Sequence, residues 1–250
     1  MLSLSALAVA SVAVAGAGVV TGLTGFGFAL ASVPVLLLVM DPASVVTATL
    51  VIGQITSSVN AWTARSHVQG TLLRALLPGA TVGIVLGSFV LRFVNPVALK
   101  LGAAVLVVLF TLLLATRRRP AGKPGATGAA LVGGASGVLA TSVGLSGPPV
   151  VLLLHGALPD KDRSRATLAA YFALTSPLGL ATLMVQGSAP WHAWQAAAVL
   201  APIALIGRAV GSRLHRSTPQ RVFRVVSLGI TLAAGLGGVA AAVATLLGHG

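Results

Sequence analysis

The sequence predicts an all-α, polytopic membrane protein made of two inverted-topology repeats, with about eight to ten membrane segments in all. Each repeat is predicted to begin with a broken or re-entrant element, followed by three spanning helices. Three observations carry this prediction: the composition, two matching interruptions of the apolar pattern, and the placement of basic residues. Hydrophobic residues make up 56% of the 250 positions and charged residues 8%, with a mean hydropathy of +1.00. Such a chain is typical of proteins whose helices cross a bilayer.

The same composition excludes several classes of function. Glu is absent, and Asp41, Asp160 and Asp162 are the only acidic residues, against 16 Lys and Arg, for a formal charge of +13. With few aromatic residues and no soluble domain, this charge indicates cytoplasmic loops rather than a nucleic-acid surface. Cysteine is absent, and the histidines show no metal-ligand spacing with carboxylates, so we expect no metal or other cofactor. The apolar runs hold no nucleophile with a base and no pair of acids, so the sequence does not predict an enzyme.

The first half, residues 1–119, is divided into five apolar runs. The leading run has no basic residue before it, so we expect a retained helix rather than a cleaved signal peptide. It and the next run are each short for a hydrocarbon core of ~30 Å at ~1.5 Å per residue, and a break at 21–25 separates them. The other runs are long enough to span. The expected elements are 4–20, 26–40, 43–64, 72–94 and 97–116.

The second half, residues 126–250, repeats this plan after a cytoplasmic linker at 120–125. One apolar run is followed by a break at 140–147 and a short run, and three spanning runs follow. The expected elements are 126–139, 148–158, 164–186, 191–212 and 222–247.

Equivalent positions in the two halves can be found by index. Adding 115 takes Gly18 and Pro34 onto a glycine and a proline, and adding 118 takes Thr49 onto a threonine. Adding 124 takes Gly83 and Gly87 onto glycines. The matches follow one another in chain order, and the offset changes between segments, as loop insertions would produce. We interpret the series as an internal duplication, a common basis of transporter folds.

Loop charge distinguishes inverted from parallel repeats. The turn at 41–42 carries no base, whereas its counterpart carries Lys161, Arg163 and Arg165. By the positive-inside rule, equivalent loops then face opposite sides of the membrane, which indicates inverted topology. The basic loops expected in the cytoplasm are 65–74, 117–123, 161–165 and 213–224, and the exceptions left outside are Arg92 and Lys100.

The two breaks are predicted to form the substrate site. Backbone that leaves helical geometry at membrane depth is tolerated only inside protein or along a wet cavity. A half-helix N-terminus there presents N–H donors and a partial positive charge to an anion. The alternative is that the glycines only permit close packing and a kink. The second break, with its serines and prolines, is expected to contribute more. The candidates are Thr24, Gly25, Gly27 and Pro34, facing Ser142, Gly144, Ser146, Gly147 and Pro148.

The next predicted helix of each half adds a polar face. Residues spaced four apart share one side of a helix, and the two symmetry-related faces are expected to converge on the central axis. The alternative for each hydroxyl is an interhelical hydrogen bond. The positions are Thr49, Gly53 and Ser57 in the first half, and Thr167, Tyr171 and Thr175 in the second.

Arg208 is the one cation within a predicted span that is expected to be able to reach the site. The guanidinium of Arg208 would match the oxygens of a sulfonate. The alternative is that its side chain reaches the cytoplasmic surface, because Arg213 is about one turn away. Gln54, Ser58 and Asn60 point away from the polar face and are assigned to packing or to contact in a homodimer.

Three short motifs, in order, carry a resemblance to a known family. They are SVGLSGPP at 142–149, RSRAT at 163–167 leading to Tyr171 and Phe172, and GxxxGSR at 207–213. With the paired breaks, they resemble the TauE/SafE sulfite exporter family, also described as toluene-sulfonate uptake permeases, over nearly the whole chain. The resemblance implies secondary transport of small sulfur-containing anions through a site between two inverted halves. Phe26 departs from the more glycine-rich run expected in the first break, which bears on substrate size.

We therefore expect a multi-pass protein of the bacterial inner membrane that moves a small sulfur-containing anion by alternating access. Sulfite, sulfoacetate or another organosulfonate, and thiosulfate are the candidate substrates that the resemblance implies. The alternative is an anion channel, or a carrier for a small anion without sulfur. The apolar runs hold no deep carboxylate, so coupling to protons, to sodium or to neither stays open.

Overall fold

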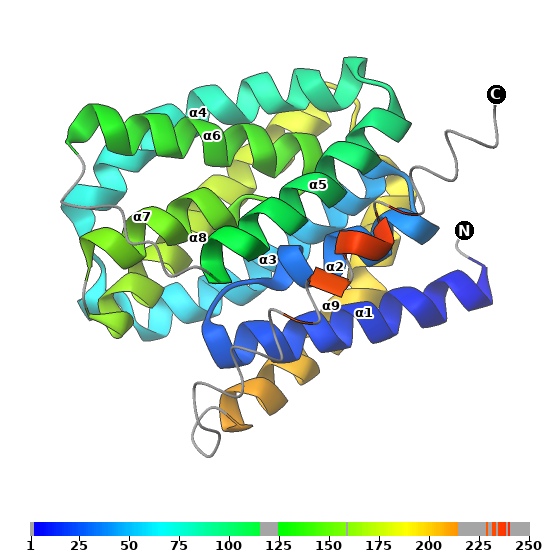
Figure 1. The fold of residues 1–250 in the computed structure, drawn as a ribbon, viewed down its shortest axis with the longest axis horizontal. Coiled ribbons are helices and arrows are strands. Elements are labelled where there is room, and N and C mark those ends of the chain that lie inside the picture. The colour runs from blue at the N-terminus through cyan, green and yellow to red at the C-terminus, as the bar shows by residue number, and fades with distance from the viewer. Residues whose placement is uncertain are drawn as a thin grey trace.

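The structure is a computed structural model that describes residues 3–115, 125–158 and 160–214, together with 229, 232–233, 235–238 and 240 (Figure 1). Every regular element in these ranges is a helix, which confirms the all-α prediction for the described part of the chain. The predicted linker at 120–125, apart from Gly125, and most of the predicted span at 222–247 lie outside the described residues.

The first half forms a short helix between longer ones. Asp41 caps the third helix, because its carboxylate accepts the Ser44 N–H at 2.9 Å. Pro42 follows in the first turn, where its missing N–H is not needed. The helices are α1 (Leu4–Thr24), α2 (Phe28–Val39), α3 (Pro42–Thr63), α4 (Gly70–Phe93) and α5 (Pro96–Ala115), with a 3-10 turn, η1 (Arg65–His67), before α4.

The second half follows the same order. Asp160 caps its third helix as Asp41 does in the first half, by accepting the Asp162 N–H at 2.9 Å. Within the described residues, seven helices are long and apolar enough to cross a membrane, whereas α2 and α7 have 12 and 11 residues. This confirms the polytopic prediction. The helices are α6 (Ala126–Val143), α7 (Gly147–Ala157), α8 (Lys161–Val185) and α9 (Trp191–Leu214).

The first helix is longer than the sequence indicates. α1 has 21 residues, which at ~1.5 Å per residue give about 31 Å, enough to span the hydrocarbon core. The expectation of a short piece ending at Val20 was wrong, because Thr21, Gly22 and Leu23 continue the helix as buried residues. The break therefore begins at Gly25.

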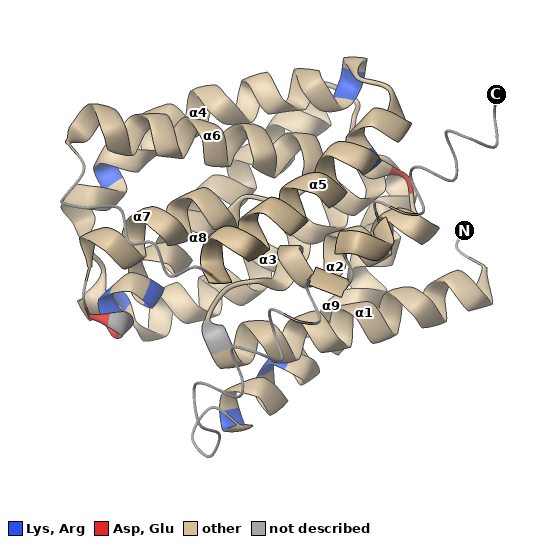
Figure 2. Ribbon diagram, in the orientation of Figure 1, with Lys and Arg blue, Asp and Glu red and all other residues tan. Residues whose placement is uncertain are grey.

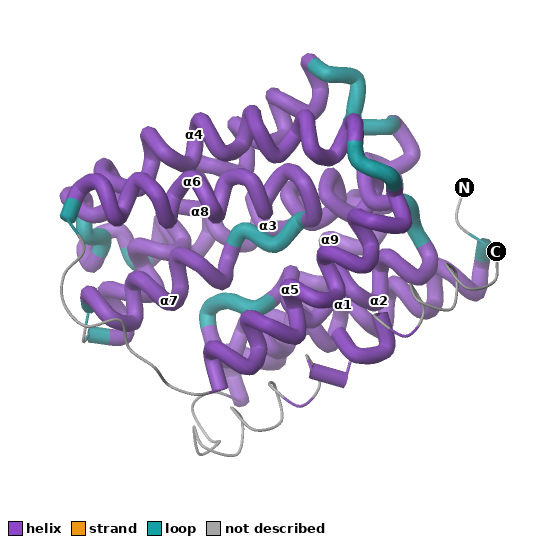
Figure 3. The backbone as a smooth tube through the Cα atoms, turned by 45° about the horizontal axis from the view of Figure 1, so that its top comes forward, coloured by secondary structure: helices purple, strands orange, loops and turns teal. Residues whose placement is uncertain are grey.

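Two helix pairs, each with one helix from either half, pack at backbone contact. α4 runs beside α6, and α1 runs beside α9, with α3 against α8 between the pairs (Figures 1 and 3). A Cβ atom on Gly83 of α4 would lie 2.1 Å from the Gly134 carbonyl oxygen, and one on Gly211 of α9 would lie 2.2 Å from that of Val19. Glycine is needed at these positions so that the backbones can approach this closely. The two halves are therefore interlocked.

The directions of α3 and α8 show how the halves are related. The Gln69 N–H, just beyond the end of α3, donates to the Thr167 hydroxyl near the start of α8 at 3.0 Å. Leu50, in the first half of α3, lies against Gly179 in the second half of α8. The two helices are thus antiparallel. Because they hold equivalent places in the two halves, the repeats have opposite directions in the bundle, as inverted topology requires.

The packing corrects the repeat register by one helical turn. Gly18 lies against the Ala204 carbonyl as Gly137 lies against the Ala80 carbonyl, and Gly211 lies against the Val19 carbonyl as Gly87 lies against that of Val138. These matching contacts keep the expected offset of 124 between α4 and α9 and give an offset of 119 rather than 115 between α1 and α6. Glycines recur every four residues on these faces, so a shift of one turn matches them equally well.

The breaks show the same shift. Gly25 and Gly144, the glycines that end α1 and α6, are 119 positions apart rather than 115. The expected match of Pro34 with Pro149 was therefore wrong: Pro34 is the seventh residue of α2, and Pro149 is the third of α7. Each break therefore begins three residues after an equivalent contact, that of Gly22 with the Arg208 carbonyl and that of Thr141 with the Ile84 carbonyl.

Charged residues lie near the ends of the helices and leave the middle of α3, α6 and α8 uncharged (Figure 2). One end, here called the basic end, holds Arg65 just after α3, Arg165 near the start of α8 and Arg213 near the end of α9. The opposite end, here called the Asp41 end, holds Asp41 beside His192. The described parts of the predicted cytoplasmic loops thus share one end, and the positive-inside rule places that end in the cytoplasm.

Candidate functional site

Both predicted breaks are present, as two short non-helical segments inside the bundle (Figure 3). In the second break, residues 144–146, Gly144 adopts φ 79°, a left-handed conformation that ends α6. The Leu145 N–H then donates to the Leu139 carbonyl at 2.9 Å. Leu145 is fully buried and packs with residues of the first half. The second break therefore lies in the interior of the protein.

Hydroxyl groups support the second break. The Ser136 hydroxyl donates to the Ser146 carbonyl at 2.5 Å, and the Tyr171 hydroxyl lies 3.5 Å from the Gly133 carbonyl. Gly144 faces α3, where a Cβ atom would lie 2.9 Å from the Thr49 hydroxyl oxygen. Ser136, which the sequence analysis did not select, is fully buried and satisfies a carbonyl that the break leaves without a helical partner.

The first break, residues 25–27, has two left-handed glycines, Gly25 at φ 83° and Gly27 at φ 96°. The side chain of Arg165 lies over Gly25, where a Cβ atom would be 2.5 Å from its Nε atom. Between the glycines, Phe26 packs edge-on to His155 of α7, with ring centroids 5.8 Å apart. Phe26 therefore fills space in the second half, as Leu145 does in the first.

The two breaks do not face each other, contrary to expectation. The first lies beside Arg165, at the start of α8, and the second beside Thr49, in the second turn of α3. Asn60 of α3 marks the level of the first break, because it accepts a hydrogen bond from Arg208. The 11 residues from Thr49 to Asn60 give a separation of about 16 Å along the bundle.

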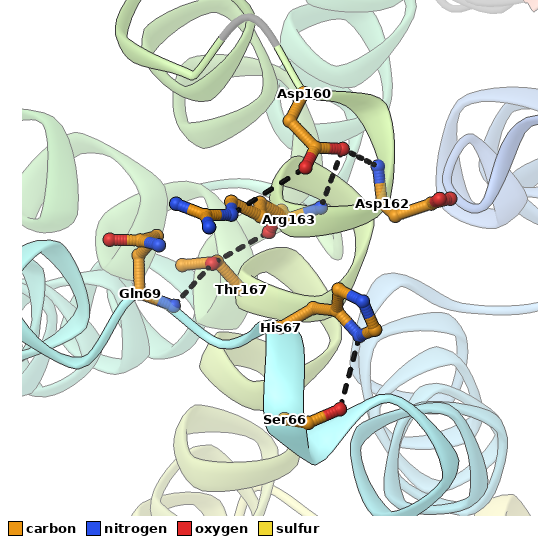
Figure 4. Close-up of polar contacts among 7 residues, drawn as sticks. All are labelled: Ser66, His67, Gln69, Asp160, Asp162, Arg163 and Thr167. Atoms are coloured by element: carbon orange, nitrogen blue, oxygen red, sulfur yellow. Dashed lines mark hydrogen bonds and ion pairs between the residues drawn. The ribbon is translucent and has the colours of Figure 1, made fainter.

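The polar faces of α3 and α8 are buried, but no hydrogen bond between described residues joins one face to the other. The hydroxyls of Thr49, Thr167 and Thr175 donate to carbonyls of their own helices at 2.7–2.8 Å. Thr167 also accepts the Gln69 N–H, at the basic end (Figure 4). Ser57 is buried, and its hydroxyl forms no hydrogen bond with a described residue. Ser57 thus offers a donor between the breaks.

Other predicted site residues form contacts within their own helix or lie inside a helix. Ser142 is buried and donates to the Val138 carbonyl of its own helix at 2.6 Å. Pro34 lies inside α2 rather than at the break, and Pro148 is buried in the first turn of α7. The side chain of Thr24 lies outside the described part of the structure.

The first break offers more backbone donors than the second. The first three N–H groups of α2, from Phe28 to Leu30, have no hydrogen-bond partner among the described residues. In α7, the second and third residues are Pro148 and Pro149, which have no N–H. The expectation that the second break contributes more to anion binding is therefore not supported by its backbone.

Arginine side chains accompany the first break. Arg208 donates to the side-chain amide oxygen of Asn60, and its own backbone carbonyl lies against Gly22 of α1. The Arg165 side chain lies over Gly25, three residues further along the chain. The assignment of Asn60 to packing or a dimer contact was thus incomplete. The sequence analysis counted Arg165 only as loop charge, although it lies in the RSRAT motif.

The arrangement of paired breaks, inverted halves and buried hydroxyls agrees with the family resemblance. The family model described as sulfite exporter TauE/SafE matches residues 10–238. The chain belongs to this family. A curated relative in it is the probable inner membrane transporter protein TsaS of Comamonas testosteroni, 28% identical over 177 residues, which cover 68% of this chain and 72% of the relative. No solved structure gives a significant match. This TauE/SafE member is thus a multi-pass transporter-type protein of the inner membrane.

Proposed function

We propose that the protein is a secondary transporter that moves a small sulfur-containing anion across the inner membrane by alternating access. Sulfite, sulfoacetate or another organosulfonate, and thiosulfate are the candidate substrates. The observation that supports this best is the pair of helix breaks, one in each of two inverted halves. Such breaks at membrane depth line substrate sites in transporters built from inverted repeats.

The proposed path follows α3 and α8 from one break to the other. Ser57 lies on α3 between the levels of the two breaks, and its hydroxyl forms no hydrogen bond with a described residue. Ser146 and Gly147 begin the half-helix α7 at one end of the path, and Arg208 lies at the other. Neutral donors along the middle suit an anion that must be bound weakly enough to leave.

Exchange in proteoliposomes tests this proposal. Vesicles loaded with unlabelled sulfite, thiosulfate or sulfoacetate should accumulate the labelled anion by counterflow, since a carrier exchanges bound substrates. Ser57→Ala should lower the rate without lowering the melting temperature, because the Ser57 hydroxyl forms no hydrogen bond with any described residue. Ser146→Val and Gly147→Leu, at the second break, should also lower the rate. Thr182→Val is the matched control, since this hydroxyl bonds only its own helix, at the Leu178 carbonyl.

The outcomes separate the alternatives. Flux that does not saturate and shows no counterflow would indicate a channel. Counterflow of chloride, nitrate or phosphate without any response to sulfur anions would indicate a carrier for a different class. Unchanged exchange in the Ser57, Ser146 and Gly147 variants would remove the path between the breaks from the mechanism.

A further inference from the structure

Two arginines lie together at the basic end without any acidic partner. Arg165 comes from the second turn of α8 and Arg208 from the last two turns of α9, and both are partly buried. Both lie against the same end of α1, because Arg208 contacts Gly22 and the Arg165 side chain contacts Gly25. Among described residues, Asn60 is the hydrogen-bond partner of Arg208, and Arg165 has neither an ion pair nor a hydrogen bond.

The acidic residues of the chain are used elsewhere. The sequence has three of them and no Glu. Asp41 lies at the opposite end beside His192, at 3.5 Å. Asp160 pairs with Arg163 at 3.5 Å, and Asp162 has no ion pair in the described structure. No side-chain carboxylate therefore neutralises Arg165 or Arg208.

The fold holds the two guanidinium groups in place. Gly22 and Gly25, in and just after the last turn of α1, leave room for them: the α9 backbone at Arg208 contacts Gly22, and the Arg165 side chain crosses Gly25. Asn60 can only accept from Arg208 through its carbonyl oxygen, which fixes one edge of the guanidinium and leaves its other donors available. Two like charges held together in this way are stabilised when an anion with several acceptor oxygens bridges them.

The opposite end has no such pair. The second break faces the neutral hydroxyl of Thr49, and Phe172 is the nearest neighbour of Gly147. The described residues thus place paired cations at one break and neutral groups at the other. This difference is not expected from the repeat symmetry, because the two breaks hold equivalent positions in the two halves.

We propose that Arg165 and Arg208 form a loading site for a doubly charged oxyanion at the cytoplasmic end of the path. The substrate class rests on the proposed transport function, whereas the site itself rests on the arginine geometry. Two guanidinium groups favour a dianion such as sulfite or thiosulfate over a monoanionic sulfonate, because each guanidinium can balance one negative charge and donate hydrogen bonds to the oxygens of the ligand. The site binds substrate from one side of the membrane only.

Anion-dependent stabilisation of the purified full-length protein tests the site. Sulfate and methanesulfonate, a dianion and a monoanion of similar shape, are titrated at constant ionic strength while the melting temperature is measured. Wild-type protein should show a saturable rise at lower concentrations of sulfate than of methanesulfonate. Arg165→Gln and Arg208→Gln should each raise the half-saturating sulfate concentration about tenfold or more, the loss expected for a charged hydrogen-bonding group.

Arg213→Gln is the matched control, because Arg213 is exposed at the same end of α9. It should leave the sulfate response unchanged. If Arg165→Gln does not fold, Arg165→Lys keeps the charge but loses the fork, and should still weaken the response. An unchanged half-saturating concentration in the Arg165 and Arg208 variants, or an equal loss in Arg213→Gln, would overturn the site.

Sidedness is tested by sulfite exchange in vesicles of known orientation. Arg165→Gln should raise the half-saturating concentration on the basic side and leave it unchanged on the other, and an equal rise on both sides would contradict a one-sided site.

Failure of the arginine site and failure of the transport proposal give different results. If wild-type protein binds sulfate through the arginines but exchanges no sulfur anion, the transport proposal fails and the site stands. If exchange is normal in both arginine variants, the site fails and transport stands.

Discussion

A methyl group at Gly83 should separate α4 from α6, and a methyl group at Gly211 should separate α9 from α1 in the same way. At Gly83 a Cβ atom would lie 2.1 Å from the Gly134 carbonyl oxygen, and at Gly211 it would lie 2.2 Å from that of Val19. Relieving either contact moves the helices apart by roughly 1 Å, which forfeits a quarter to a half of the dispersion energy along the interface. Packing of this kind is a main source of helix association in a bilayer. Overpacking predicts a loss of about 1–3 kcal/mol for Gly83→Ala and for Gly211→Ala.

Thermal unfolding of the purified variants in one detergent measures this loss. Gly102→Ala on α5 is the control, because a Cβ atom there would have no neighbour within 4 Å. It should be neutral or stabilised by at most about 1 kcal/mol, the intrinsic helix preference for alanine over glycine. If Gly83→Ala and Gly211→Ala are as stable as Gly102→Ala, the backbone contacts between the halves are not what holds the pairs together.

Further predictions concern single polar groups. Ser136→Ala should lower the free energy of unfolding by about 1–3 kcal/mol, measured by thermal unfolding, because it leaves the partly buried Ser146 carbonyl without its donor. Burial raises the pKa of the Asp41 carboxyl, but hydrogen bonds from Ser44 and the nearby His192 outweigh it and lower the pKa below its ordinary value of 3.8. The stabilisation from Asp41 is therefore present above that value and lost as pH falls through the lowered pKa. In Asp41→Asn the melting temperature should depend less on pH across this acid range. Thr167→Val should lower the melting temperature at neutral pH, since the partly buried N–H of Gln69 loses its acceptor.

Much of the fold follows from local sequence. Apolar runs of helical length bounded by Asp, Pro and basic residues set the number and order of the helices. The breaks were located to within a few residues, because only glycine adopts the left-handed backbone found at Gly25 and Gly144 without strain. The exact repeat register was not available from the sequence, since glycines spaced one turn apart match equally well in two registers. The matching contacts of Gly18 and Gly137 with the opposite half distinguish them.

The candidate site was less predictable, because its partners are distant in sequence. Ser136 is ten residues from the carbonyl it binds, and Arg208 is 148 residues from Asn60. The polar faces on α3 and α8 were correctly placed on one side of each helix, but helical periodicity does not show which neighbour a face meets. Arg165 could have been selected as a site residue, because it follows the Asp160 cap closely and lies in the RSRAT motif that supports the family resemblance. It was instead interpreted only as a basic residue of a cytoplasmic loop.

The interlocked pairs also bear on how alternating access would work. If one repeat rocked against the other as a rigid body, the backbone contacts of α1 with α9 and of α4 with α6 would break in every cycle. Because these contacts join backbone to backbone at several glycines, the bodies that move are expected to be the mixed pairs themselves, sliding past α3 and α8. Gly83→Ala separates the two mechanisms. If the pairs move as units, the variant loses stability but its folded fraction exchanges anions at the wild-type rate. If the α4 and α6 interface opens during the cycle, the exchange rate per folded molecule changes as well.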